Sequence, residues 1–93
     1  VDVAIKRNAA GVVEVNSGTN GTLRDLKARA FISDERIRLK GYTVSGLSGI
    51  SSPTVGDTAY VTDATAPTYL GALTGGGAVV CPVFYNGSAW VSG

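Results

Sequence analysis

Apolar and polar residues alternate in short runs along this chain, and such alternation is typical of β-strands with one buried face. Residues 36–40 show it most clearly, because Ile37 and Leu39 alternate there with two arginines and a lysine. The runs are separated by glycine, asparagine and serine, which favour turns. We therefore expect an all-β chain of short antiparallel strands and hairpins. The other strand-like runs lie at residues 3–5, 12–15, 58–63 and 78–85.

One segment, residues 23–30, fits two kinds of element. Its apolar residues fall at helical spacing after Thr22, which could cap such a helix. The same residues also alternate between small or apolar and basic side chains, as they would in a strand. We favour a strand, because the segment is short and turns are predicted on both sides, at residues 16–21 and 33–35.

The end of the chain predicts a β-hairpin. Residues 78–85 form a strand-like run, and residues 88–92 are the expected return strand. Asn86 and Gly87 stand between them, and this pair is preferred in two-residue type I′ turns because both positions need positive φ. Asn86 and Gly87 are therefore assigned to a structural turn.

Side chains of this hairpin suggest how it packs. Pro82 lacks an N–H, which predicts a place at a sheet edge, a strand end or a bulge. Across the pair of strands, we expect Phe84 or Tyr85 to lie near Trp90 as an aromatic contact. Core packing is the expected role of Phe84, of Trp90 and of Cys81, which has no basic neighbour to make its thiol reactive.

Charged residues divide the chain into two parts. All eight basic residues lie within the first forty positions, whereas the only charges after them are Asp57 and Asp63. A loop rich in glycine and serine follows the basic part, at residues 45–53. We therefore expect a strand-rich N-terminal domain at residues 1–45 and a β-hairpin domain at residues 46–93.

Composition excludes several classes of function. Only 16% of the residues are charged, against roughly 25% in an average soluble domain, while 44% are apolar. A surface so poor in charge suggests contact with another chain. The net charge of +1 argues against a nucleic-acid partner. The absence of histidine and the single cysteine remove the usual metal ligands and any disulfide within the chain, so we expect no metal and no cofactor.

Membrane-spanning and targeting segments are the next features to consider. No apolar run approaches the roughly 20 residues that a bilayer-spanning helix needs, and no signal-peptide layout is present at the start. We therefore expect no membrane insertion. Because the first residue is Val1 and not methionine, we expect a fragment or a processed product.

Catalytic groups are scarce. Asp57 and Asp63 are six positions apart, about 20 Å in an extended strand, which is too far for a glycosidase pair within one chain. No histidine base accompanies the many serines and threonines, so nucleophilic catalysis is not expected. The chain is therefore predicted not to be an enzyme. A hydrolase site at chain interfaces, using Asp57, Asp63 or Glu35, is the hypothesis that this prediction opposes.

Aromatic residues are the remaining candidates for binding. Five of them could stack on sugar rings, and the tyrosines most expected to be exposed are the favoured receptor contacts. These candidate contacts are Tyr60, Tyr69 and Tyr85.

Two stretches resemble known proteins. Residues 8–16 with 21–29 are similar to segments near the distal end of bacteriophage tail fibres and tailspikes. The closing stretch is similar to a small C-terminal module of phage fibre and structural proteins. That second similarity rests on residues 56–64, 67–68, 75–77 and 83–91.

This resemblance implies a virion protein that forms a β-rich homotrimer around a threefold axis, with a β-prism or β-sandwich-like tip. In that picture, residues 1–45 are a trimerising stem, and residues 46–93 a tip that attaches to a host cell-surface polysaccharide. The protein would lie in a tail appendage, after assembly in the host cytoplasm. A capsid fibre, decoration or assembly module without receptor binding is the alternative. No catalytic residue carries over, because no catalytic motif of the family is present.

Overall fold

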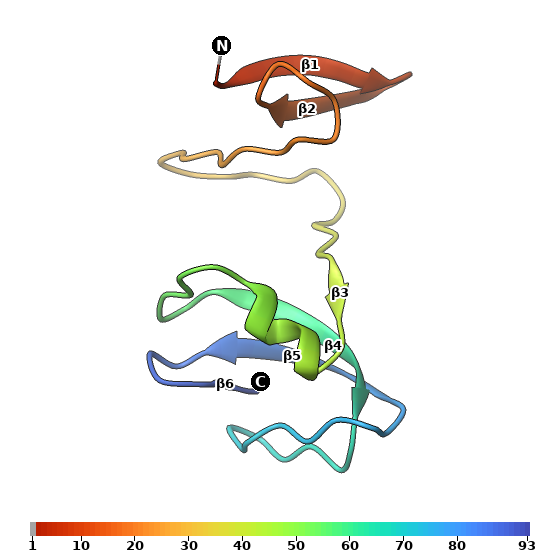
Figure 1. Ribbon diagram of the computed structural model, residues 1–93, viewed down its shortest axis with the longest axis vertical. Coiled ribbons are helices and arrows are strands. Elements are labelled where there is room, and N and C mark those ends of the chain that lie inside the picture. Colours follow the sequence, from red (N-terminus) through yellow and green to blue (C-terminus); the bar gives the residue numbers. More distant parts are fainter. Residues whose placement is uncertain (1) are drawn as a thin grey trace. The chain divides into compact units, whose positions relative to one another are not determined.

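The computed structural model describes residues 2–93 and separates the chain into two compact units. Unit 1 is Val1–Glu35 and unit 2 is Arg36–Gly93. Strands make up most of the regular structure, and the described residues contain one short 3-10 helix but no α-helix (Figure 1). The prediction of a mostly β chain is therefore confirmed. The predicted domain boundary after residue 45 falls inside unit 2, and the intertwined homotrimer stays a prediction.

An antiparallel hairpin forms the regular structure of unit 1. β1 (Ala4–Ala9) pairs with β2 (Val12–Asn16), with a register irregularity between Arg7 and Ala9. The turn between the strands contains Gly11 at a φ of 75°, a left-handed conformation that glycine adopts without strain. The strand predicted at residues 12–15 is thereby confirmed, whereas the run predicted at residues 3–5 forms a strand that continues to Ala9.

A cluster of polar groups ties β2 to the loop that follows it. The Glu14 carboxylate accepts hydrogen bonds from the side-chain amides of Asn8 (2.7 Å) and Asn16 (2.9 Å). It also accepts one from the Gly21 N–H at 2.7 Å. Asn16 is fully buried, and its Oδ1 accepts a hydrogen bond from the Gly18 N–H at 2.8 Å. The Asn16 amide first, and then the Gly21 N–H, lower the pKa of Glu14, because they stabilise its charged form.

Two predicted strands are absent. Residues 24–40 contain no strand or helix, and Leu23 makes only an isolated bridge to Asn16. The strand predictions for residues 23–30 and 36–40 are therefore wrong. Alternation defines a face, but a strand also needs a neighbour to pair its backbone, and no described residue forms a ladder with this segment. Its exposed large hydrophobic side chains are Leu26, Phe31, Ile32, Ile37 and Leu39.

A four-stranded mixed sheet forms unit 2, in the order β3-β4-β5-β6 (Figure 1). β4 (Thr58–Ala64), β5 (Val79–Tyr85) and β6 (Trp90–Ser92) are antiparallel neighbours, whereas β3 (Gly41–Tyr42) runs parallel to β4. The expectation of purely antiparallel strands is wrong for this pair. Residues 43–57 carry the chain back before β4 begins, and a crossover of that length allows neighbouring strands to be parallel.

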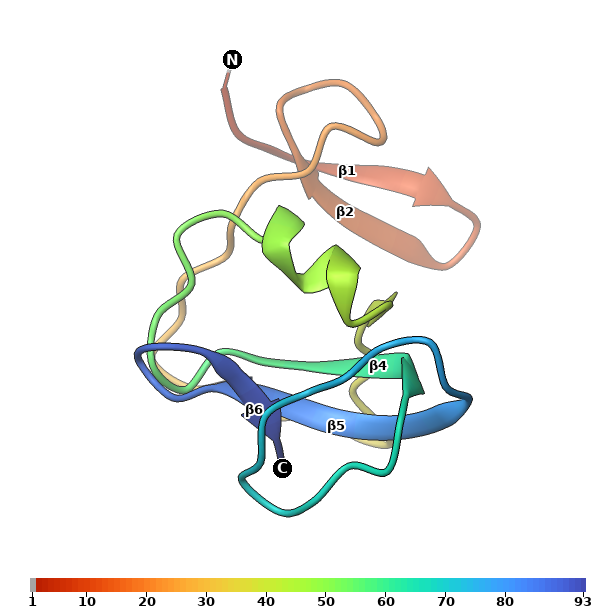
Figure 2. The same cartoon turned by 60° about the horizontal axis from the view of Figure 1, so that its bottom comes forward.

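The core of unit 2 lies on one face of this sheet. The 3-10 helix η1 (Ser45–Gly49) covers that face (Figure 2), and its Leu47 packs into a buried cluster with Val61 of β4 and Val83 of β5. Cys81 belongs to the same cluster, so the prediction that it is a small buried side chain is confirmed. Burial of each large aliphatic side chain stabilises such a core by about 1.5–3 kcal/mol.

The opposite face of the sheet is less covered. Tyr60 pairs with Pro82 and Thr58 pairs with Phe84, so strand alternation places these four residues away from η1. Tyr60 and Phe84 are half-buried, and Val80, on the same face, is 65% exposed. Phe84 therefore packs on this face and not in the main core.

The closing hairpin is present, but its loop differs from the prediction. Tyr85 pairs with Trp90, so the loop has four residues, 86–89, and not two. Gly87 has a φ of 101°, whereas Asn86 does not adopt positive φ and uses its side chain instead. Asn86 Oδ1 accepts hydrogen bonds from the N–H groups of Ser88 and Ala89, each at 2.9 Å. This side chain completes the turn in place of the left-handed backbone that a type I′ turn would need.

Pro82 lies at a position where the neighbouring strand requires no hydrogen bond from its nitrogen. The Tyr85 N–H donates to the Asp57 carbonyl on the β4 side at 2.9 Å, so the nitrogen of Pro82, three residues earlier, faces the β6 side. β6 pairs only with residues 83–85, and Gly93 then donates to the Pro82 carbonyl at 2.9 Å. Pro82 therefore lies at a local edge, beyond the end of β6, as the sequence predicts.

Candidate functional site

The three tyrosines predicted to contact a receptor occupy different places. Tyr60 lies on the less covered face of the sheet, where its ring lies against Gly41 of β3. Tyr85 lies on the core face, and Tyr69 stands in the loop between β4 and β5, 80% exposed. Because Tyr60 and Tyr85 are on opposite faces, at most two of the three can share one binding surface.

Unit 2 has a pocket of about 280 Å³ beside its core. It lies between the sheet and Ile50, the residue that follows η1. Aromatic, aliphatic and charged side chains all contribute to its lining. The lining residues are Leu39, Lys40, Tyr42, Ile50, Asp57, Thr58, Ala59 and Trp90.

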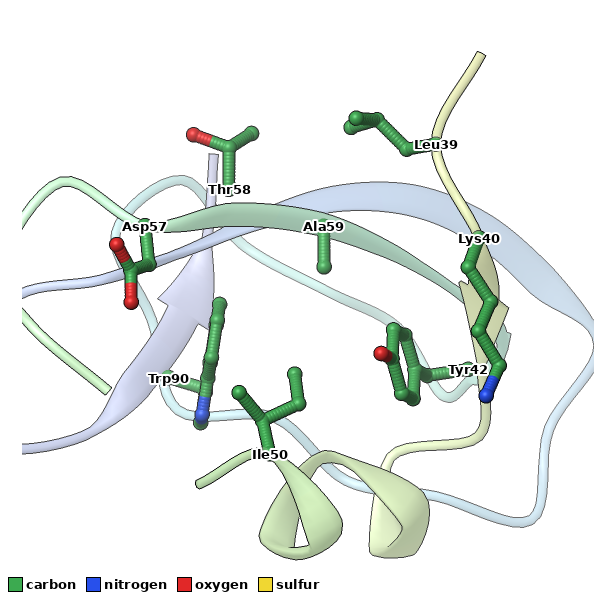
Figure 3. A pocket seen from close by; sticks show the side chains of 8 residues that line it. All are labelled: Leu39, Lys40, Tyr42, Ile50, Asp57, Thr58, Ala59 and Trp90. Atoms are coloured by element: carbon green, nitrogen blue, oxygen red, sulfur yellow. The ribbon is translucent and has the colours of Figure 1, made fainter. Parts of the chain in front are cut away.

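Four side chains surround the space inside the pocket (Figure 3). Trp90 of β6 and Tyr42 of β3 stand on opposite sides, and Ile50 lies between them. Ala59 points in from β4, and the Tyr42 hydroxyl is directed toward the Trp90 side. Thr58 and Leu39 point to the other side of the ribbon (Figure 3), so the pocket is bounded mainly by two aromatic rings and two aliphatic groups.

The two aromatic rings are held by neighbours. Tyr85 meets Trp90 edge to face, with ring centroids 5.6 Å apart and an interplanar angle of 64°. The Lys40 ammonium lies 5.1 Å from the centroid of the Tyr42 ring, within the range of a cation–π interaction. The contact predicted between Trp90 and Phe84 or Tyr85 is therefore confirmed, with Tyr85 as the partner.

One carboxylate and one ammonium stand at the two ends of the pocket. Asp57 lies at the Trp90 end and Lys40 at the Tyr42 end (Figure 3). Asp57 is held at the start of β4, because its Oδ2 accepts a hydrogen bond from the Thr54 N–H at 3.0 Å. The pocket thus combines an apolar interior with one negative and one positive charge at its rim.

Two carboxylates of the hydrolase hypothesis, Asp57 and Asp63, lie toward opposite ends of β4 in unit 2. Asp57 precedes β4, whereas Asp63 is near its other end and accepts a hydrogen bond from the Val44 N–H at 2.8 Å. Glu35 belongs to unit 1. Among residues 2–93, no group of three or more histidine, cysteine or acidic side chains could hold a metal ion. The absence of enzymatic activity stays a prediction.

Sequence reasoning did not find this pocket. Tyr42 and Trp90 are two of the five aromatic residues that the sequence offers for stacking on sugar rings, but core packing is the role it favours for Trp90, and Tyr42 is not among the favoured contacts. β3 has only two residues and pairs in parallel with β4, so no local pattern indicates that Tyr42 and Trp90 lie across one pocket. Trp90 does pack against the core, and one and the same side chain also lines the pocket.

No protein-family model matches this chain, and no curated protein or solved structure was found to be similar to it. No helix among residues 2–93 is long and apolar enough to cross a membrane.

Proposed function

We propose that this chain is a virion structural domain, the distal part of a bacteriophage tail fibre or tailspike. It assembles as a homotrimer and attaches to a glycan on the host cell surface, without enzymatic activity of its own. The family-like residue pattern at both ends of the chain supports the class of protein. The alternative role is that of a capsid fibre, decoration or assembly module without receptor binding.

The exposed apolar face of the unit 1 hairpin is the observation that carries the assembly. Ile5 pairs with Val15, and Val13 pairs with Arg7, so Ile5, Val13 and Val15 share one face. Ile5 and Val13 are each 73% exposed. A two-stranded hairpin is at best marginally stable alone, and it needs a hydrophobic face packed against something else. Further copies of the same chain would supply that cover.

The connecting segment supports the same proposal. Between the two hairpins, Ile32 is 93% exposed and Phe31 is 68% exposed, on backbone that forms no ladder with described residues. Extended chain with exposed hydrophobic side chains is suited to pairing with another chain. The resemblance to tail fibres and tailspikes supports three copies in the assembly.

The mass of the purified chain in solution tests the assembly. Native mass spectrometry or light scattering is expected to give three times the chain mass. Val13→Asp places a charge on the apolar face, and we expect it to raise the concentration needed for assembly roughly tenfold or more. Thr19→Asp adds the same charge in an exposed turn and should leave assembly unchanged. A wild-type chain that stays single at every concentration would contradict the trimer.

Binding to host cells separates the two roles. A fluorescently labelled trimer is expected to bind host cells or their purified surface polysaccharide, and enzymatic removal of the polysaccharide should abolish the binding. Three linked sites raise avidity, so the Val13→Asp variant in its monomeric form should bind the polysaccharide more weakly than the wild-type trimer. A stable trimer that binds neither cells nor polysaccharide would favour the capsid fibre or decoration module.

A further inference from the structure

We infer that the pocket of unit 2 binds one neutral pyranose ring of a polysaccharide. The inference rests on the proposed attachment function only for the source of the sugar, because the pocket is formed by residues of unit 2 alone. It also moves the receptor contact away from the three predicted tyrosines, Tyr60, Tyr69 and Tyr85, none of which lines this pocket.

The size of the pocket fits a single ring. Its volume of about 280 Å³ lies just below the range of drug-sized small-molecule sites, which begins at roughly 300 Å³. Asp57 and Lys40 at its two ends are exposed, so the ring's substituents can continue into solvent at both ends. A site of this form accepts one residue of a longer chain and leaves its neighbours outside.

The chemistry of the walls fits the two kinds of surface that a pyranose presents. The C–H groups of a sugar ring form apolar patches above and below it, and these pack well against aromatic faces. Trp90 and Tyr42 offer such surfaces on opposite sides of the pocket (Figure 3). Both side chains also carry a polar group, the indole N–H and the phenol O–H, that can bind a sugar hydroxyl. The Asp57 carboxylate, at the Trp90 end, is a hydrogen-bond acceptor for another.

The charges at the rim select a neutral ligand. One ammonium and one carboxylate give the pocket no net charge, so neither an acidic nor an amino sugar gains overall from it. The Lys40 ammonium is also engaged with the Tyr42 ring, 5.1 Å from its centroid, which reduces its availability to an anion. A uronic acid would place its carboxylate in the same pocket as Asp57 and would be repelled there.

Fluorescence of Trp90 gives a direct measurement, because it is the only tryptophan of the chain. The trimer is titrated with the methyl pyranosides of glucose, galactose, mannose and N-acetylglucosamine, and separately with methyl glucuronide. We expect a saturable change of Trp90 emission with at least one neutral glycoside. We expect a weaker response, or none, with the glucuronide.

Variants of Tyr42 test the site, with matched changes at Tyr69 as controls. Tyr42→Leu removes the aromatic wall and should raise the Kd roughly tenfold. Tyr42→Phe keeps the wall and the packing but removes the hydroxyl, and it should raise the Kd by a few fold. Tyr69→Leu and Tyr69→Phe alter an exposed tyrosine outside the pocket and should leave the Kd unchanged. If Tyr42→Leu fails to fold, Tyr42→Phe decides the question.

Three results would overturn the inference. They are no change with any neutral glycoside, tighter binding of the glucuronide than of the neutral sugars, and equal weakening by the Tyr69 and Tyr42 variants. Native mass measured on the same samples keeps the two proposals apart. Trimers without a sugar response would remove this site and leave the assembly proposal standing. Monomers that bind the glycoside would contradict the assembly proposal and support the sugar site.

Discussion

Glu14 shows how one half-buried carboxylate can fix a loop in so small a unit. It accepts hydrogen bonds from two side-chain amides and from the Gly21 N–H, and these contacts lower its pKa. A lowered pKa in the folded state means that the folded state prefers the charged carboxylate. The contribution is therefore fully present above the ordinary glutamate pKa, and it is lost as the pH falls through the lowered one.

Glu14→Gln is expected to loosen the loop after β2, because the amide is a weaker acceptor than the carboxylate. Faster amide hydrogen exchange of Gly21 at neutral pH would show this. In the wild-type chain the protection factor of Gly21, which corrects for the intrinsic pH dependence of exchange, should fall in acid as the pH drops through the lowered Glu14 pKa. Asp25→Asn changes an exposed carboxylate elsewhere in unit 1 and should have no such effect. Equal protection of Gly21 in both variants would contradict the role given to Glu14.

Asn86 plays a similar part in unit 2. Its side chain accepts hydrogen bonds from the N–H groups of Ser88 and Ala89, so Asn86→Ala should lower the free energy of unfolding by about 1 kcal/mol. Chemical denaturation measures the difference. Ser88→Ala keeps the backbone N–H that Asn86 binds, so it should be nearly neutral. A destabilisation by Ser88→Ala as large as that by Asn86→Ala would show that the loop and not the Asn86 side chain is responsible.

Strand elements were predictable where the chain itself supplies the partner. β1, β2, β4 and β5 were expected from composition and turns, and each pairs with a strand nearby in sequence or across one loop. Residues 36–40 had the cleanest alternation but form no strand, because side-chain pattern carries no information about a backbone partner. β3 escaped prediction for the opposite reason, since it is only two residues long and pairs in parallel across a crossover.

The loop between β4 and β5 depends on glycine at residue 77. The Gly77 N–H donates to the Asp63 carbonyl at 2.9 Å, and a Cβ at this position would overlap the carbonyl oxygen of Ala64. Gly77→Ala should therefore lower the free energy of unfolding of unit 2 by about 1–3 kcal/mol, as overpacking does elsewhere.

Gly49→Ala is the matched control for that change. No atom outside its immediate neighbours lies within 4 Å of a Cβ built at Gly49, so this variant should stay within about 0.5 kcal/mol of the wild type. Thermal or urea unfolding of the two variants provides the comparison. Equal stability of both variants would mean that the β4–β5 loop can move to accept a side chain.

At the scale of the whole molecule, the two units differ in the number of hydrophobic side chains that each buries by itself. Unit 2 has a buried cluster around Val61 and Val83, covered by Leu47 of η1. Unit 1 has a hairpin on which Ile5 and Val13 are exposed. The fully buried side chain of this unit is that of the polar residue Asn16. The charge pattern predicted two parts, but it could not show which part has its own core, because exposure depends on packing that composition does not record.

Separate expression of the two units should reveal this difference. We expect residues 36–93 to keep their strand signal in circular dichroism and dispersed NMR spectra. Residues 1–35 should be largely unfolded as single chains, because a two-stranded hairpin is marginal alone. A cooperative unfolding transition in isolated, monomeric residues 1–35 would contradict the view that this unit depends on other copies.

Cys81 is the only thiol in the chain, and it lies inside the sheet of unit 2 with the Ser92 hydroxyl 4.0 Å from its sulfur. A thiol reagent such as a maleimide can reach Cys81 only when the core of unit 2 opens. The labelling rate therefore measures the frequency of local opening of the sheet. The wild-type chain thus contains a single-site probe for the opening rate of unit 2. This probe reports on unit 2 separately from the assembly of unit 1.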